Sequence, residues 1–276
     1  MFGLVPFSAL EIKWSDPIPW EEAGVFTAAK PNMMHDLVAC FFICTFGFLV
    51  LFKTCEWLLE NFGTLVFGPH SEFHKMSKKV KKEYYSRIVS DLHAVLGISM
   101  SIYSTYYSCE NPKDNIFTSF ECATTPNLVG LYCIAFSSAY CVYDIYVCLV
   151  EIEFTAFECR DYIFHHVMGC IGGVTSFTFG YFCPILSVAI LISETSNFCM
   201  NIRWRLLKHK MTEHWSFVAA SMAFMITFFC SRVFFMLMVV LRCIELNQSF
   251  TFTKVHPIAY SCCIGAEVAL GLLYIL

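Results

Sequence analysis

The sequence carries little charge for its length. Charged residues make up 14% of the 276 residues and hydrophobic residues 57%, whereas a soluble domain has about 25% charged residues. Mean hydropathy is +0.61. The net charge of −4 is too small to indicate a nucleic-acid partner, and no basic-aromatic pattern suggests one. The composition predicts an all-α membrane protein with several spans.

The sequence also lacks cysteine pairs with the spacing of a metal site. Sixteen cysteines are present, but no C-x-x-C pair has the spacing of a zinc site. Most of them lie in apolar runs, where cysteine behaves as a small hydrophobic residue. We therefore expect no metal and no cofactor. Cys109 and Cys122 differ from the rest because they share one polar loop, so an oxidising compartment could join them; the alternative is two free thiols.

Targeting signals are absent from the start of the chain. Residues 1–35 lack the basic start and short apolar core of a signal peptide, and they lack the Arg-rich, acid-poor character of a mitochondrial presequence. We expect an extra-membrane segment over 1–35 and one transmembrane domain over 36–276. An endoplasmic reticulum or other endomembrane location is favoured, with the mitochondrial inner membrane as the alternative.

Seven apolar stretches are each close to the ~20 residues that a membrane helix needs. Basic loops follow the first and the fifth stretch, at 74–87 and 203–210, so both fall on one side, which the positive-inside rule assigns to the cytosol or matrix. An acidic connection at 151–161 falls on the same side and fits this rule less well. The seven predicted spans are 37–59, 87–107, 128–150, 162–179, 182–199, 217–241 and 256–276.

Several predicted spans contain ionisable residues. Such side chains are costly in lipid, so they usually face a protein interior and carry function. Asp91 and His93 lie two positions apart and point to nearly opposite sides of a helix; we favour His93 for the interior and expect Asp91 to pair with Arg87. Asp144 needs a partner deep in the third span. Arg232 of the sixth span and a histidine of the fourth are the two candidates.

The fourth and fifth spans carry the densest polar set. His165 and His166 lie near the start of one helix and Glu194 near the end of the next, so an antiparallel hairpin places them at equal depth. Asn197 and Asn201 follow Glu194 on the same helix face, at i+3 and i+7. The spacing permits a His–carboxylate site on the basic side of the membrane. The alternative is a structural set of hydrogen-bonded polar groups.

Four segments carry a resemblance to a known family. They read RIVSDLHAVLG at 87–97, SSAYCVYDIY at 137–146, DYIFHHVMG at 161–169 and ISETSNFCMNIRWRL at 192–206. In order and spacing they resemble TLC-domain membrane proteins, a family that includes ceramide synthases, and are most similar to its TLC-domain-containing branch. The resemblance covers most of 35–276. It implies six helices around a central cavity with one more outside.

The sequence departs from the ceramide synthase pattern at one point. In those enzymes the adjacent histidines are followed by His-Asp-x-x-Asp, whereas the matching residues here, Ser193 to Asn197, read SETSN. The first acid is kept as Glu194 and the second becomes an amide. This departure favours a protein without ceramide synthase activity.

Two functions remain open. The first is non-catalytic binding of membrane lipid in the cavity, in lipid homeostasis or as an accessory subunit beside other membrane proteins. The second is a lipid acyltransferase that takes acyl-CoA as substrate, with His165 or His166 as base or acyl acceptor, oriented by Glu194 or Asp144. In either case the residues expected to line the cavity are His93, Asp144, Asn197, Asn201 and Arg232. We expect no glycan on the sequon at Asn247, because it lies close to the sixth span.

Overall fold

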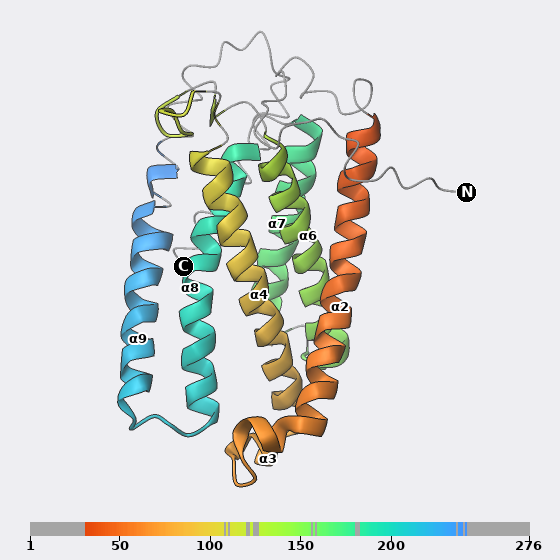
Figure 1. Ribbon diagram of the computed structural model, residues 1–276, viewed down its shortest axis with the longest axis vertical. Helices are drawn as coiled ribbons and strands as arrows, with labels where there is room; N and C mark the ends of the chain where they lie inside the picture. The colour runs from red at the N-terminus through yellow and green to blue at the C-terminus, as the bar shows by residue number, and fades with distance from the viewer. Residues whose placement is uncertain are drawn as a thin grey trace, which may run out of the picture.

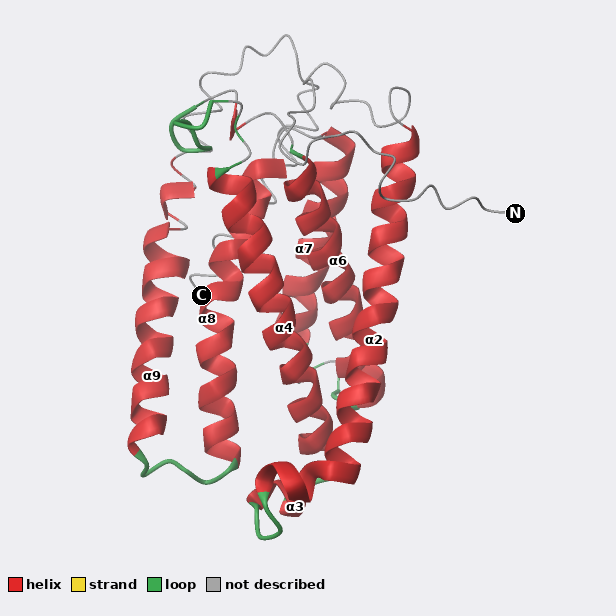
Figure 2. Ribbon diagram, in the orientation of Figure 1, coloured by secondary structure: helices red, strands yellow, loops and turns green. Residues whose placement is uncertain are grey.

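The computed structural model describes residues 31–241, apart from 108, 110, 120–121, 124–126, 156, 158, 180–182, 236 and 240. Over this part the chain forms a bundle of helices, and the described residues contain no β-strand (Figure 2). The prediction of an all-α membrane protein is therefore confirmed. The seventh predicted span, 256–276, lies outside the described residues, as do the sequon at Asn247 and residues 1–30.

Six long helices and one short helix make up the bundle (Figure 1). Two of the long helices, α6 and α9, continue into π-helical segments. Polar caps fix some of the starts: Ser77 accepts a hydrogen bond from the backbone N–H of Val80, and Asn127 accepts one from that of Gly130. The elements are α2 (Pro31–Phe67), α3 (Glu72–Lys75), α4 (Lys78–Tyr106), α6 (Leu128–Tyr146) with η2 (Val147–Glu151), α7 (Arg160–Phe179), α8 (Cys183–Lys208) and α9 (Trp215–Phe228) with η3 (Phe229–Phe235).

Three of these helices are long and apolar enough to cross a membrane by themselves, namely Met33–Phe67, Leu128–Glu151 and Trp215–Val239. They coincide with the first, third and sixth predicted spans. The second, fourth and fifth predicted spans lie within α4, α7 and α8. Because α4 and α8 also include charged residues at their basic ends, both helices extend beyond the apolar runs that indicated them.

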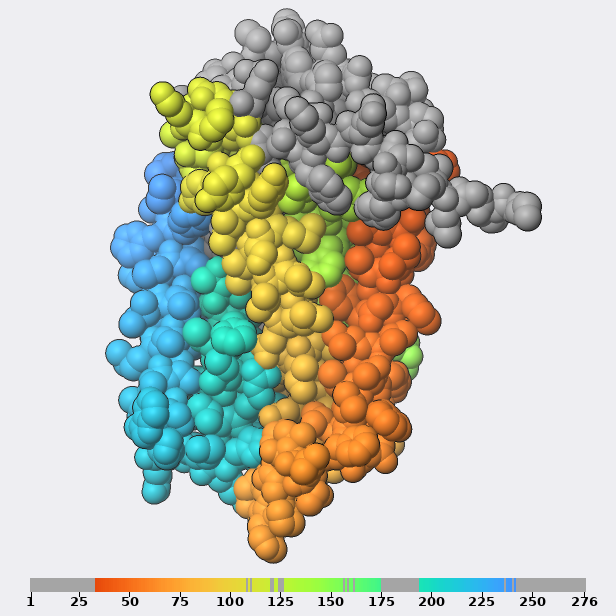
Figure 3. Space-filling view, viewed as in Figure 1, coloured from red at the N-terminus to blue at the C-terminus, as the bar shows by residue number. Residues whose placement is uncertain are grey.

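The helices α2, α4, α8 and α9 follow one another across one face of the molecule (Figure 3). Behind them α6 packs against α2, α4, α7 and α8, so it lies at the centre of the described bundle. Aromatic residues fill the space between α2, α4 and α6. Phe52, Tyr85 and Tyr143 are all almost completely buried there. The residues of α6 in this aromatic core lie next to the α6 residues of the polar interior.

Close contact between α6 and α7 depends on glycine. A Cβ atom added at Gly173 would lie 2.3 Å from Oγ of Ser138, and one added at Gly169 would lie 3.3 Å from Sγ of Cys141. Small residues allow membrane helices to approach closely. This contact brings the polar residues of α7 next to those of α6.

Both basic loops lie at the same end of the bundle, as the charge pattern predicts. Nζ of Lys210, after α8, is 2.7 Å from Oε2 of Glu72 in α3. Lys210 and Lys75 together lower the pKa of the Glu72 carboxyl to about 2. Glu151 of the acidic connection lies between Lys53 and Lys82, at 2.8 and 2.9 Å. Its negative charge on the basic side is therefore neutralised.

The opposite end carries a disulfide between Cys109 and Cys122. Cys109 follows the end of α4, whereas the basic residues of the first loop lie at the start of that helix. Of the two alternatives that the sequence leaves open, the structure has the disulfide, and the disulfide and the basic loops lie at opposite ends of the bundle.

Candidate functional site

The interior of the bundle contains a set of buried ionisable side chains, here called the buried polar cluster. It consists of His93 from α4, Tyr140 and Asp144 from α6, His166 from α7 and Glu194 from α8. Their exposed fractions run from 0% for Asp144 to 7% for Glu194. Four helices thus converge on one site with two carboxylates and two histidines. Groups of this kind inside a membrane protein are expensive and usually functional.

Asp144 accepts contacts from three helices. Its Oδ1 accepts a hydrogen bond from Ser86 of α4 at 3.2 Å, and its Oδ2 accepts one from Tyr140 at 3.3 Å and another from Tyr162 of α7. Nε2 of His166 lies 3.2 Å from the same Oδ2. The partner of Asp144 is therefore the histidine of the fourth span, and among the described contacts Arg232 does not reach it.

His166 is the member of the His-His pair that faces the carboxylate. Its Nε2 is at ion-pair distance from Asp144 but is not aligned for a hydrogen bond, and its Nδ1 also has no hydrogen-bond partner. The ring of Tyr162, one turn earlier, packs edge-on against it at 4.4 Å. His165 lies beside His166, with 5.3 Å between ring centroids, and is less buried.

His93 forms a second histidine–carboxylate pair. Its Nδ1 is 3.4 Å from Oε2 of Glu194, and its Nε2 is 3.2 Å from the hydroxyl of Ser137. Its ring stacks on Tyr140, with centroids 3.9 Å apart. Tyr140 therefore joins the two pairs, because it stacks on His93 and donates to Asp144.

The hairpin geometry permits a pair between Glu194 and one of the adjacent histidines, and the ion-pair contact that the structure gives Glu194 is with His93 of α4. The reason lies in the packing of the helices. Among the described residues, helix α8 packs far more extensively against α4 than against α7. Chain neighbours are therefore not the closest spatial neighbours, and Glu194 meets a histidine of α4.

Arg232 belongs to the edge of the same site. In η3 its Nε donates to Oγ of Ser196 at 3.1 Å, and its Nη2 donates to Oδ1 of Asn197 at 3.0 Å. Asn197 in turn donates to Oε2 of Glu194 at 3.2 Å. Arg232 is therefore connected to the Glu194 carboxylate through Asn197.

Asn201 lies outside the buried polar cluster, in a network of ion pairs between α4 and α8. It accepts a hydrogen bond from Arg87 and donates one to Asp91, both at 2.8 Å. Asp91 pairs with Arg205 at 2.5 Å, while Arg87 pairs with Glu83 at 2.8 Å. The expected pairing of Asp91 with Arg87 is therefore wrong. The packing of α8 against α4 places Arg205 next to Asp91, while Arg87 turns to Glu83 on its own helix.

Three residues at Asp144 were not predicted, namely Ser86, Tyr140 and Tyr162. A signal for two of them exists in the sequence, because Tyr140 precedes Asp144 by four positions and Tyr162 precedes His166 by four. Residues four apart share a helix face. No local pattern marks Ser86, which lies among the basic residues of α4.

The site suits proton exchange and hydrogen bonding to a polar group. Each histidine lies next to a carboxylate and retains at least one ring nitrogen without a hydrogen-bond partner. Among the described residues, no group of three His, Cys, Asp or Glu side chains is placed to hold a metal ion.

Comparison with known proteins agrees with the fold. No curated protein and no solved structure matches the chain. The family model of the TLC domain matches residues 83–276. This region begins in α4 and includes all members of the buried polar cluster, as well as Arg232 and Asn201. Since the match covers more than half of the sequence, the chain belongs to the TLC domain family.

Proposed function

We propose that the protein binds a membrane lipid inside the helix bundle, with the polar part of the lipid at the buried polar cluster. Its family is one of lipid-related membrane proteins. The observation that carries the proposal is Nδ1 of His166, which has no partner. Nδ1 of His93 and Nε2 of His166 support it, because each faces a carboxylate without an aligned hydrogen bond, in side chains only 2% and 5% exposed. A buried polar group without a partner costs about 1–3 kcal/mol. A lipid hydroxyl, amide or carbonyl would satisfy these nitrogens.

Binding without turnover is supported by the way the other polar groups are engaged. Three hydroxyl groups already donate to Asp144. Ser196 and Asn197, which lie in the region where the ceramide synthase pattern has its acid residues, are bonded to Arg232. Because these hydroxyl and amide groups are engaged in hydrogen bonds within the protein, few polar groups at the site remain free for chemistry. Such a binding site would suit a role in lipid homeostasis or a role as an accessory subunit of a membrane assembly.

An endomembrane location is part of the proposal. Disulfides form in oxidising compartments such as the lumen of the endoplasmic reticulum. The Cys109–Cys122 disulfide lies at the end of the bundle opposite the basic loops. The loop that contains it would then face the lumen, and the basic loops would face the cytosol.

Lipid analysis of the purified protein tests the binding proposal. Protein extracted from membranes should carry about one bound lipid that survives delipidation, as measured by native mass spectrometry. His93→Phe and His166→Phe should each lose this lipid, because phenylalanine removes the ring nitrogens. His35→Phe provides the matched control, since His35 is exposed near the start of α2. Equal occupancy in all three variants would show that the cluster does not hold the lipid.

An acyltransferase is the second candidate, and one observation favours it. His166 lies beside a carboxylate and has an unpartnered Nδ1, which is the arrangement of a general base oriented by an acid. His166 would take the proton from a lipid hydroxyl or amine. The oxygen or nitrogen that lost the proton would attack the carbonyl carbon of acyl-CoA. Coenzyme A would leave as its thiol after it takes the proton back from His166.

Release of free coenzyme A thiol from purified protein measures this activity. His166→Ala should abolish it and Asp144→Asn should lower it by about 10²-fold or more, while His35→Phe should leave it unchanged. Acyl transfer in the wild type that disappears only in the first two variants would establish the enzyme. No thiol release from wild-type protein supplied with acyl-CoA and a range of lipid acceptors would leave lipid binding as the function.

A further inference from the structure

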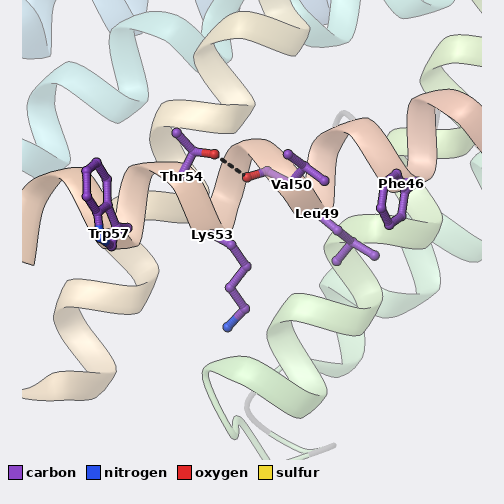
Figure 4. A pocket seen from close by; sticks show the side chains of 6 residues that line it. All are labelled: Phe46, Leu49, Val50, Lys53, Thr54 and Trp57. Carbon is purple, nitrogen blue, oxygen red and sulfur yellow. Dashed lines mark hydrogen bonds between the residues drawn. The ribbon is translucent and has the colours of Figure 1, made fainter.

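A groove runs along the outer face of α2, away from the buried polar cluster (Figure 4). Its volume is about 400 Å³, which lies within the range of ligand pockets. The hydroxyl of Thr54 is satisfied, because it donates to the carbonyl of Val50 at 2.7 Å. The only charged group that lines the groove is the ammonium of Lys53. This α2 groove is lined by Phe46, Leu49, Val50, Lys53, Thr54 and Trp57.

The groove crosses the boundary of the membrane. From Leu37 to Phe52 the helix has no charged residue, a length of roughly 24 Å at about 1.5 Å per residue. Lys53 is the first charge after this run, and Trp57, one turn later, is 58% exposed. Lysine and tryptophan at the end of an apolar run are typical of the membrane interface. Phe46 therefore lies at acyl-chain depth, and Lys53 and Trp57 at headgroup depth.

The headgroup end of the groove carries charges of both signs. Nζ of Lys53 is 3.0 Å from Glu56 and 2.8 Å from Glu151. An ammonium has three donors, and these two contacts leave one for a further acceptor. Lys53 is also half exposed, and Glu56 is partly exposed. A phosphate could thus reach Lys53 while a neighbouring cation reaches Glu56.

We propose that the α2 groove binds one zwitterionic glycerophospholipid of the basic-side leaflet. One acyl chain lies along Phe46 and Val50, the phosphate contacts Lys53 and the headgroup cation contacts Glu56. An anionic lipid fits less well, because its headgroup has no cation to place beside Glu56 and Glu151. The site does not depend on the buried polar cluster. It also lies outside residues 83–276, which match the TLC domain.

Lipid titration of the delipidated full chain in detergent tests the proposal. Native mass spectrometry should show one phosphatidylcholine bound above the annular background, and phosphatidylglycerol should bind about tenfold more weakly. Thr54→Trp fills the groove and Lys53→Met removes the phosphate contact, so each should weaken phosphatidylcholine binding by about tenfold or more. Val38→Trp is the matched control, because Val38 is exposed on α2 but lies two turns before Phe46 and does not line the groove.

Two results would overturn the proposal. One is equal binding of the two lipids, and the other is equal binding by Thr54→Trp and Val38→Trp; either would show annular lipid only. Because Thr54→Trp leaves the ion pairs of Lys53 intact, it keeps the test valid if Lys53→Met fails to fold. His93→Phe should retain the groove lipid, so failure at the buried polar cluster can be told apart from failure here.

Discussion

Replacing Gly173 by alanine should weaken the contact between α6 and α7. The new Cβ would lie 2.3 Å from Oγ of Ser138 and 3.4 Å from Cγ2 of Ile134. The first distance is far below van der Waals contact, so Ser138 must change rotamer or α7 must move away. Overpacking of this kind costs about 1–3 kcal/mol. Part of that cost is hidden by the better helix propensity of alanine, about 1 kcal/mol.

Two further variants isolate the steric part of the effect. Gly47→Ala in α2 places a Cβ where no atom lies within 4 Å, so it measures the propensity gain alone. Ser138→Ala removes the clashing oxygen and leaves the Cβ of residue 138 at 3.5 Å from the new methyl group, an ordinary contact. The double variant of Ser138 and Gly173 should therefore recover most of the lost stability.

Unfolding in detergent, followed by circular dichroism, is the assay. Gly173→Ala should be less stable than Gly47→Ala by about 1–3 kcal/mol, and the double variant should unfold close to Ser138→Ala. If the two glycine variants shift unfolding by the same amount, or if Ser138→Ala gives no rescue, the close approach of α6 and α7 does not control stability.

Three other predictions concern the ends and the centre of the bundle. Replacing Cys109 and Cys122 by serine should lower the free energy of unfolding by about 2–4 kcal/mol. Non-reducing peptide mapping of the wild type should recover the two peptides linked, and recovery of two free thiols would contradict the pairing. The pKa of Glu72 is lowered to about 2, so its ion pair with Lys210 should persist above pH 4.5 and weaken as the pH falls from 4.5 to 2. The measurement is amide exchange in α3 relative to the intrinsic rate at each pH, in which protection should fall; Glu72→Gln should abolish this pH dependence. Asp144→Leu leaves buried donors without an acceptor and should lower the free energy of unfolding by about 3–5 kcal/mol, whereas Asp144→Asn should lower it by less. An equal loss of unfolding free energy in the two variants would mean that packing alone matters at this position.

The apolar runs of the sequence predicted the helices well but not their ends. The run 37–59 lies inside α2, which continues to Phe67. The second run began at 87, yet α4 begins at Lys78. Its first turns stay helical because Lys82 pairs with Glu151 and Tyr85 donates to Glu60. These two contacts come from other helices, whereas the Ser77 cap at the start of α4 is a local signal that the apolar runs do not carry.

The choice of partners inside the bundle depends on which helices are neighbours. Periodicity placed His93 and Glu194 on interior faces, but it could not show that α8 packs along α4. The pair between these two residues therefore follows from the tertiary arrangement alone. For Asp144 the sequence left two partners, and the close contact of α6 with α7 decides for His166.

The π-helical segment η2 keeps two polar sites mechanically independent. In it the backbone N–H of Ile152 donates to the carbonyl of Val147, five residues earlier, instead of four. This wider turn changes the angular phase of every residue that follows it. Asp144, before the segment, can thus point to the histidines while Glu151, at its end, points to Lys53 and Lys82. Deleting one residue of η2 would rotate Glu151 by ~100° about the helix axis and leave Asp144 in place, so it would break the ion pairs with Lys53 and Lys82 while His166 keeps its carboxylate partner.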